Sequence, residues 1–321
     1  MDHLIIPKFV PENRPHQSLQ FMNLLKTTLV LCLCTSLAFS TISLQEKDAL
    51  LAIYHATNGE NWTNSWDLDQ PITTWYGVEI IDGQVVGLDL SFNNLEGQIP
   101  QQIGDLTHLN YLTLYRNKIS GAIPCSIEGL SQLKTLNLAF NELNGKIPVS
   151  VGNLKNLQGL HLFMNRLVGE LPDSIGDLTA LETLELFSNG LDGNIPEELG
   201  KLSNLKVLSL SSNFLTGKIP ASLRNLTELK TLELYDNQLF GVIPTYLSEL
   251  SHLEELILSD NAFYGKIPNE LTRLTNLKIL MLNNNDLIGD DAALRLAFTN
   301  LEQFEIQNMS KQKNTAVANN D

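Results

Sequence analysis

Apolar residues recur along most of this chain with a fixed period of 24 residues, in nine units that run from Val85 to Asn300 without an insertion. Each unit follows the pattern L-x-x-L-x-L-x-x-N-x-L-x-G-x-I-P-x-x-I-G-x-L-x-x. The L-x-L step alternates with a period of two, as in Leu208-x-Leu210, and predicts a strand with one buried face. Leu223 and Leu226, three residues apart, supply the inward face of the returning segment. Because one coil cannot bury its own apolar edge, the pattern predicts a solenoid in which each coil stabilises its neighbours.

Three other positions of the unit have special backbone or hydrogen-bonding properties. The glycine, such as Gly217, suits a tight bend that a Cβ would obstruct, and the proline, such as Pro220, suits a short turn or a helical start. The asparagine follows the strand, where its amide can satisfy backbone groups of its own coil and of the adjacent coil. We expect these asparagines to form a structural ladder made of Asn93, Asn117, Asn141, Asn165, Asn189, Asn213, Asn237, Asn261 and Asn285.

This pattern resembles the plant-type leucine-rich repeat, and the resemblance covers residues 85–300. It implies an α/β fold, a right-handed leucine-rich-repeat solenoid, or horseshoe, with a concave parallel β-sheet. On the convex side it implies short helices or 3-10 turns, and often a second small strand in each coil. It also implies recognition of other molecules rather than catalysis, without specifying the ligand.

The first 40 residues have the pattern of a secretory signal. Residues 27–39 are almost entirely apolar, follow a lysine, and lead into Ala38-Phe39-Ser40, which suits cleavage after Ser40. Met22 is a natural start, so residues 1–21 are predicted to be an upstream extension. An uncleaved signal anchor is the alternative. No later segment reaches the roughly 18 consecutive apolar residues of a membrane-spanning helix, so we predict no membrane span after signal cleavage.

Residues 41–84 are predicted to form an N-terminal cap on the repeats. Leu44 to Thr57 has the pattern of an amphipathic helix, and we expect the three tryptophans that follow to plug the open end of the core. The stretch resembles the N-terminal cap of plant-type leucine-rich repeats. It lacks the cysteine pair of that cap, because Thr74 and Glu79–Ile80 occupy the flanking positions.

The repeats also change character at their other end. The ninth unit has Ala292 in place of the proline, and Asp290 to Phe298 has a helical pattern. Residues 301–321 are predicted to be a truncated final coil, with a strand at Phe304-x-Ile306, followed by a disordered tail.

Composition and motifs narrow the function classes. The chain has 21 Lys+Arg against 36 Asp+Glu, a net charge of −15, which opposes binding to nucleic acid. It contains no H-E-x-x-H, G-x-S-x-G or phosphate-binding glycine motif and no kinase motif after the repeats. The histidines lack metal-ligand spacing, and His108 and His252 are expected to lie on the solvated surface. We therefore predict a chain that is not an enzyme and that has no cofactor or metal site.

Residues just before each ladder asparagine differ from coil to coil and are expected to face solvent on the concave sheet. The first five coils carry mainly aromatic and apolar residues there, and the seventh and eighth carry acidic ones, including Glu255. An exposed apolar patch beside acidic groups favours a binding site, although the rings could instead stack to stabilise the sheet. The candidate ligand-binding residues are Phe92, Tyr115, Arg116, Phe140, His161, Phe163, Met164, Glu185, Phe187, Glu233, Tyr235, Asp236 and Asp260.

The sequence thus favours a secreted recognition module that binds a protein, peptide or glycan on its concave face. The expected location is extracellular, on the cell surface, or in the periplasm if the host is bacterial. Two alternatives remain open, a structural scaffold without a discrete ligand and an inhibitor of a secreted wall-degrading enzyme. A third is a hydrolase using Glu185 and Glu233, which lie two coils and therefore roughly 10 Å apart.

Overall fold

The computed structural model describes residues 42–289, 292–298 and 301–306. The chain divides into two units after Thr41, and all the described residues belong to the second unit, which begins at Ile42. The predicted signal segment, residues 1–40, lies outside the described residues, as do residues 307–321 of the predicted tail. Within the described residues, no helix combines the length and the apolar character needed to cross a membrane.

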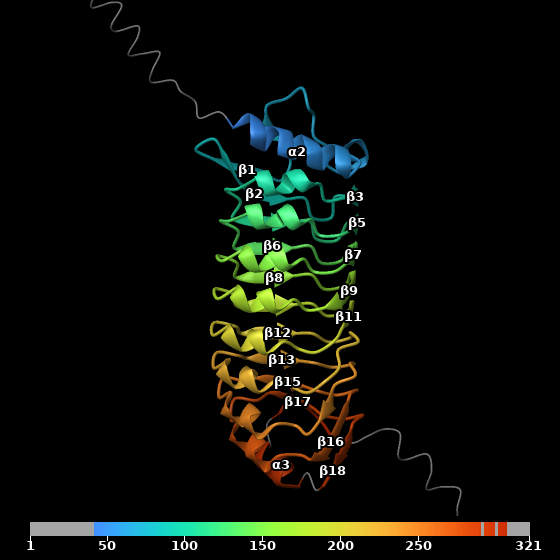
Figure 1. Cartoon of the computed structure of the whole chain (residues 1–321), viewed down its shortest axis with the longest axis vertical. Coiled ribbons are helices and arrows are strands. Elements are labelled where there is room, and N and C mark those ends of the chain that lie inside the picture. The colour runs from blue at the N-terminus through green and yellow to red at the C-terminus, as the bar shows by residue number, and fades with distance from the viewer. Residues whose placement is uncertain (1–41, 290–291, 299–300, 307–321) are drawn as a thin grey trace, which may run out of the picture. The chain divides into compact units, whose positions relative to one another are not determined.

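The second unit is built on an eleven-stranded sheet to which each coil contributes one strand (Figure 1). The first two strands are antiparallel, and from the second strand onward all neighbours are parallel, with Leu184 paired to Leu208 and so on along the sheet. In order across the sheet the strands are β1 Val78–Ile81, β2 Gln84–Asp89, β4 Tyr111–Thr113, β6 Thr135–Asn137, β8 Gly159–His161, β10 Thr183–Glu185, β12 Val207–Ser209, β13 Thr231–Glu233, β15 Glu255–Ile257, β17 Ile279–Met281 and β19 Gln303–Glu305.

The strands lie one residue earlier than the L-x-L pattern predicts. β12 ends at Ser209, so Leu210 comes just after the strand, where the chain already bends toward Asn213. Leu208 and Leu210 are nevertheless both fully buried. The alternation of leucines therefore predicts correctly which side chains are buried, but the regular strand ends before the second leucine.

A short 3-10 helix follows the proline in each of the first eight coils, and Figure 1 shows these helices stacked along the unit. In every case the proline precedes the first helical residue, because its restricted φ suits the entry to a helical turn. These helices confirm the predicted convex turns. They are η3 Gln101–Asp105, η4 Cys125–Gly129, η5 Val149–Asn153, η6 Asp173–Asp177, η7 Glu197–Lys201, η8 Ala221–Asn225, η9 Thr245–Glu249 and η10 Asn269–Arg273.

Smaller strands lie between the main sheet and the 3-10 helices, as the resemblance implies. Five form one sheet, β3 Glu96–Gln98, β5 Lys118–Gly121, β7 Glu142–Gly145, β9 Arg166–Glu170 and β11 Gly190–Asp192, and three form another, β14 Phe240–Gly241, β16 Ala262–Lys266 and β18 Asp286–Ile288. The repeated glycine closes this part of the coil. Gly217 has a φ of +82°, and a Cβ there would lie 2.3 Å from the Asn194 side-chain oxygen.

The asparagine side chains bind backbone groups of two coils at once. Nδ2 of Asn213 donates to the carbonyl of Leu186 in the preceding coil at 3.1 Å and to Leu210 in its own coil at 3.0 Å. Its Oδ1 accepts a hydrogen bond from the backbone N–H of Leu191 at 3.1 Å. The same three kinds of bond recur from Asn117 to Asn285. The amides thus satisfy buried backbone groups that the turn leaves without partners.

The three tryptophans are buried at the N-terminal end of the coils. The indole N–H of Trp62 donates to the Thr57 carbonyl at 2.8 Å, and Trp66 and Trp75 stack with their ring centroids 4.7 Å apart. The cap also joins the asparagine ladder, because the backbone N–H of Asn64 donates to Oδ1 of Asn93 at 2.6 Å.

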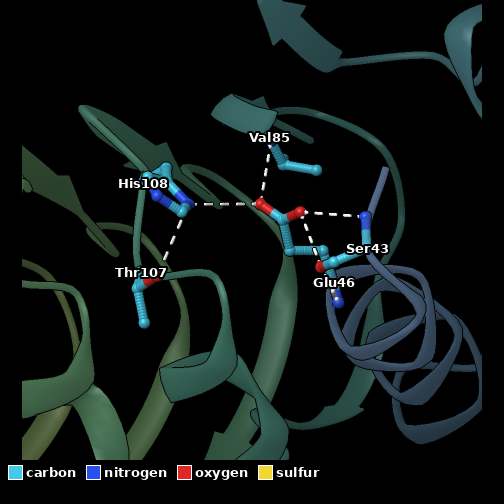
Figure 2. Close-up of polar contacts among 5 residues, drawn as sticks. All are labelled: Ser43, Glu46, Val85, Thr107 and His108. Atoms are coloured by element: carbon cyan, nitrogen blue, oxygen red, sulfur yellow. Dashed lines mark hydrogen bonds and ion pairs between the residues drawn. The ribbon is translucent and has the colours of Figure 1, made fainter. Parts of the chain in front are cut away.

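The first helix of this region, α2 (Leu44–Ala56), is held on the first coil by Glu46. Figure 2 shows the Glu46 carboxylate accepting from the backbone N–H of Val85 at 3.0 Å and from the Ser43 hydroxyl at 2.8 Å.

The two histidines expected on the solvated surface differ in their surroundings. Nδ1 of the half-exposed His108 lies 3.6 Å from the Glu46 carboxylate, so this side chain contacts the protein as well as solvent. His252, at the same register, is exposed, and its Nδ1 is 2.9 Å from the Thr227 carbonyl.

At the other end of the repeats, the ninth coil replaces the 3-10 helix with α3 (Ala292–Ala297). Of the Asp290–Phe298 range expected to be helical, residues 290–291 lie outside the described residues, and Phe298 directly follows the helix. β19 then adds the last described strand to the main sheet, with Phe304 paired to Leu280.

Candidate functional site

The candidate residues lie on one surface, which we call the sheet face. It consists of the outward side chains of the main strands and of the two residues between each strand region and its ladder asparagine. The sequence had suggested that the residues directly before each asparagine are strand positions, but the structure places them after the strands. They adopt the left-handed region with φ between 53° and 56°, and they are Phe92, Arg116, Phe140, Met164, Ser188, Ser212, Asp236, Asp260 and Asn284.

This left-handed residue has a physical role in the coil. It reverses the local chain direction after the second leucine, so that the next side chain, the ladder asparagine, is directed to the coil interior. Backbone hydrogen bonding between coils continues through the turn, since the Arg116 N–H donates to the Ala139 carbonyl at 3.0 Å. The sheet face therefore remains continuous beyond the ends of the regular strands.

Five aromatic rings on the sheet face form a contiguous row, which we call the ring ladder. It runs through the first five coils in the order Phe92, Tyr115, Phe140, Phe163 and Phe187. The first three contacts are edge-to-face, with ring centroids 5.2, 5.4 and 5.5 Å apart. Phe163 and Phe187 stack in parallel at 4.4 Å. Phe92 is 58% exposed and the other four rings are half-buried, so the rings contact each other and also present apolar surface to solvent.

A cation lies beside the N-terminal end of the ring ladder. Cζ of Arg116 is 5.5 Å from the centroid of the Phe92 ring and 5.8 Å from that of Phe140, within cation–π range. No carboxylate of the described residues forms an ion pair with it. An open hollow of about 340 Å³ adjoins this arginine and is lined by Thr63, Phe92, Asn94, Arg116, Asn117 and Lys118.

The two glutamates considered as a hydrolytic pair each have a polar neighbour on the adjacent strand. Oε2 of Glu185 lies 2.6 Å from Nδ1 of His161, and Oε2 of Glu233 accepts from the Ser209 hydroxyl at 2.6 Å. β12 separates the strands that carry the two glutamates. Each carboxylate thus has a hydrogen-bonding partner on the neighbouring strand.

A second open hollow, the central hollow, begins where the ring ladder ends. It has a volume of about 330 Å³ and is lined by Phe187, Ser211, Ser212, Glu233, Tyr235, Ile257 and Met281. Three of these, Phe187, Glu233 and Tyr235, are candidates from the sequence. The candidate set omits Ile257 and Met281. Their signal in the sequence is an apolar residue at an outward strand position where the earlier coils carry polar ones.

Acidic groups gather beside the central hollow. Burial raises the pKa of the Glu255 carboxyl, and the nearby charge of Glu233 raises it further. Asp260 accepts a hydrogen bond from the Asn284 amide at 3.0 Å, and Asp236 occupies the same register one coil earlier. Among the described residues, no lysine, arginine or histidine forms an ion pair with any of these four carboxylates. This end of the sheet face therefore carries negative charge, whereas Arg116 supplies a cation near the other end.

The described residues contain no group of three or more His, Cys, Asp or Glu side chains arranged to hold a metal ion. Cys125, at the start of η4, is an exposed free thiol. The interactions that the sheet face shows are aromatic contacts, hydrogen bonds and a cation–π contact.

Comparison with known proteins agrees with this architecture. A family model described as a leucine-rich repeat region matches residues 85–239, and a second, described as a leucine rich repeat, matches residues 252–274. Polygalacturonase inhibitor 1 of Arabidopsis thaliana is 33% identical over 119 residues, which cover 33% of this chain and 36% of the inhibitor. Matches to this inhibitor, to the leucine-rich repeat protein FLOR 1 and to the receptor-like kinase TMK4 span only 11–36% of those relatives.

Solved structures match over more of the chain. PEPR1 in its complex with AtPEP1 superposes with a TM-score of 0.73 at 28% identity, over 81% of this chain and 41% of that one. A plant ice-binding protein superposes with a TM-score of 0.66 at 28% identity, over 82% of this chain and 94% of that one. From its repeat pattern, its stacked parallel sheet and these matches, the chain belongs to the leucine-rich repeat family, as a plant-type member.

Proposed function

We propose that this protein is a secreted, non-enzymatic recognition module that binds a peptide, or an extended segment of a protein, along its sheet face. The carrying observation is the continuity of the apolar surface. Five contacting rings lead directly into the central hollow, since Phe187 is both the last ring of the ladder and part of the hollow's lining. Partly exposed aromatic rings are favoured anchors in protein interfaces.

The backbone beneath the rings supports a role beyond stability. A left-handed conformation is costlier for a bulky residue than for asparagine or aspartate. Coils seven to nine have Asp236, Asp260 and Asn284 at this position, whereas the first and third coils have Phe92 and Phe140. Bulky residues that stay partly exposed in a strained conformation favour a functional explanation for their placement.

The relatives support a peptide or protein ligand. Solved neighbours include PEPR1 with AtPEP1 and the receptor kinase HAESA of Arabidopsis with the peptide hormone IDA and the co-receptor SERK1. The HAESA complex superposes with a TM-score of 0.65 at 32% identity. Secretion is supported by the signal pattern in residues 1–40 and by the ectodomain origin of such neighbours.

The hydrogen bonds of two sheet-face glutamates support the proposal that the protein is not an enzyme. The candidate hydrolytic pair, Glu185 and Glu233, is engaged with His161 and Ser209 along the sheet. The relatives include polygalacturonase inhibitor 1, which is an inhibitor by name, and the receptor-like kinase TMK4, of which the match covers only 11%.

A second candidate function is inhibition of a secreted wall-degrading enzyme, which the similarity to polygalacturonase inhibitor 1 favours. It places a folded protein, rather than a free peptide, on the sheet face. An assay of polygalacturonase activity with and without the purified chain separates the two, because only an inhibitor lowers the rate.

The test is an affinity capture from the secretions of the native host with the chain beginning at Thr41. The wild type is compared with Phe163→Ala/Phe187→Ala, after circular dichroism has shown equal folding. Tyr264→Ala is the matched control, because Tyr264 is 49% exposed on β16 and lies off the sheet face. We expect a peptide or protein that the wild type and Tyr264→Ala retain and the double variant loses. A partner held equally by all three forms would contradict the proposal and favour the scaffold function.

A further inference from the structure

We propose that the ligand of the sheet face carries an apolar side chain that enters the central hollow and, beside it, a lysine or arginine that meets Glu233 and Glu255. This inference rests on the proposed function and specifies the class of peptide that the site takes. It follows from the lining of the hollow, from the charge beside it and from the span of the ring ladder.

The lining of the hollow selects an apolar group. Ile257, Met281 and the rings of Phe187 and Tyr235 form most of its wall, and Ser211 and Ser212 supply hydroxyl groups. A volume of about 330 Å³ is at the lower end of the range for small-molecule sites, roughly 300–1,000 Å³. The hollow is open to solvent along the sheet face, so it suits one or two side chains of a longer ligand better than a whole enclosed molecule.

The charge beside the hollow selects a cation. Glu233 is part of the lining, and Glu255 is on the next strand, where its partly buried carboxyl lies in the field of Glu233. Glu254, which precedes Glu255, is already paired with Lys278 and Lys230. The carboxylates of Glu233 and Glu255 form no ion pair among the described residues, although the charge of Lys278 acts on Glu255 as well and lowers its pKa. A ligand cation would relieve their mutual repulsion and form charge-assisted hydrogen bonds.

The two ends of the sheet face give the ligand a direction and a length. Arg116 lies near the N-terminal end of the sheet face, in the second coil, and Glu233 lies in the seventh. Five strand spacings of about 4.8 Å separate these coils, a span of roughly 24 Å. An extended peptide rises about 3.3 Å per residue, so roughly seven to eight residues reach from one end to the other. The basic residue of the ligand therefore lies about seven residues from a group that suits Arg116, such as a carboxylate.

Selection from a phage-displayed library of random dodecapeptides tests this inference. The bait proteins are the wild type, the ring variant Phe163→Ala/Phe187→Ala and the charge variant Glu233→Gln/Glu255→Gln. A second charge variant, Glu228→Gln/Glu270→Gln, removes two negative charges from exposed positions outside the sheet face and serves as the matched control. Synthetic copies of enriched peptides are then titrated against each protein by fluorescence anisotropy at 50 and 300 mM salt.

We expect enriched peptides with an apolar residue next to lysine or arginine. Their binding should weaken at least tenfold in Glu233→Gln/Glu255→Gln, with a smaller salt dependence, and remain within twofold of wild type in Glu228→Gln/Glu270→Gln. Peptides that depend on the rings but show no basic preference, or that bind the sheet-face charge variant equally well, would overturn the inference and leave the proposed function standing. Failure of any peptide to prefer the wild type over the ring variant would overturn both.

Discussion

The carboxylate of Glu46 accepts a hydrogen bond from the backbone N–H of Val85 at 3.0 Å, across 39 residues of sequence (Figure 2). This bond joins the first helix to the first coil. The Glu46 side chain is only 5% exposed, and its second oxygen binds Ser43 in the capping box of the same helix. Glu46 thus caps its own helix and also accepts a hydrogen bond from the first coil, which has no preceding repeat to provide an acceptor.

Glu46→Ala should therefore destabilise the fold. It leaves the Val85 N–H buried without an acceptor and removes a charge-assisted bond, which together cost about 2–3 kcal/mol. Glu46→Gln retains an acceptor and should lose about half as much. Urea unfolding followed by tryptophan fluorescence measures the change, because all three tryptophans lie in this region. The exposed Glu60→Ala is the control, and equal losses in Glu60→Ala and Glu46→Ala would contradict the role of Glu46.

Asn213→Ala should be among the costlier substitutions in the repeats. It deprives the carbonyls of Leu186 and Leu210 and the N–H of Leu191 of their side-chain partner. Buried unpaired groups cost about 1–3 kcal/mol each, so we expect a loss of about 3 kcal/mol or more in the free energy of unfolding. Asn269→Ala, at an exposed asparagine on η10, should change it by less than about 0.5 kcal/mol. Similar values for both substitutions would show that the ladder amides are dispensable.

Glu254, just before β15, and Glu255, its first residue, should affect stability with opposite signs. Burial and the charge of Glu233 raise the pKa of Glu255, whereas the hydrogen bond from Lys278 lowers the pKa of Glu254. A raised pKa means that stability is full when the carboxyl is protonated and falls as the pH rises through the titration. A lowered pKa means that stability is present at neutral pH and is lost on acidification.

Glu255→Gln should accordingly raise the melting temperature at pH 7, and Glu254→Gln should lower it. At pH 3 the Glu255 carboxyl, whose pKa is raised, is largely protonated in the wild type, so the gain from Glu255→Gln should shrink toward zero. The loss from Glu254→Gln should be smaller at pH 3 than at pH 7, because the stability that a lowered pKa confers is lost on acidification. Calorimetric melting of the three proteins at the two pH values provides the measurement. A stabilising effect of Glu255→Gln that persists undiminished at pH 3 would point to packing rather than charge.

Asn225 should carry a glycan when the chain passes through a eukaryotic secretory pathway. It begins the sequon Asn225-Leu226-Thr227, is exposed at the end of η8, and projects from the side of the coil that carries the 3-10 helices. Endoglycosidase treatment of the secreted chain should release mass that Asn225→Gln no longer carries. Ligand binding on the sheet face should be the same with and without this glycan. An unmodified Asn225 peptide in the secreted chain would refute the prediction. The sequence contains two other sequons, Asn61-Trp62-Thr63 and Asn308-Met309-Ser310, and the second of these lies outside the described residues.

The repeat register could be read from the sequence because stacking imposes it on every coil. Leucines such as Leu208 must be buried between neighbours, Gly217 must adopt a positive φ, and Pro220 must precede a short helix. Each requirement acts locally and repeats every 24 residues, so the period itself reports the fold. The length of the regular strand was harder to predict from the sequence, because a leucine such as Leu210 is buried whether or not its backbone is still extended.

The ring ladder could be predicted only in part from the sequence. Its residues could be assigned to neighbouring columns, but the contact of Phe92 with Tyr115 and the parallel stack of Phe163 on Phe187 depend on where each turn directs its side chain. The central hollow depends on side chains from five coils, including Ile257 and Met281, whose joint position no single unit reveals.

The sequence by itself determined the repeated coil, its stacking partners and the variability of one face, because these follow from burial and backbone conformation within 24 residues. Only the tertiary structure decided which variable residues touch, that the left-handed turn carries half of the sheet face, and that Glu46 is buried against Val85. The physical reason is that contacts between coils depend on side-chain direction and on docking across the stack. A linear pattern specifies the order of residues, but it does not contain those directions.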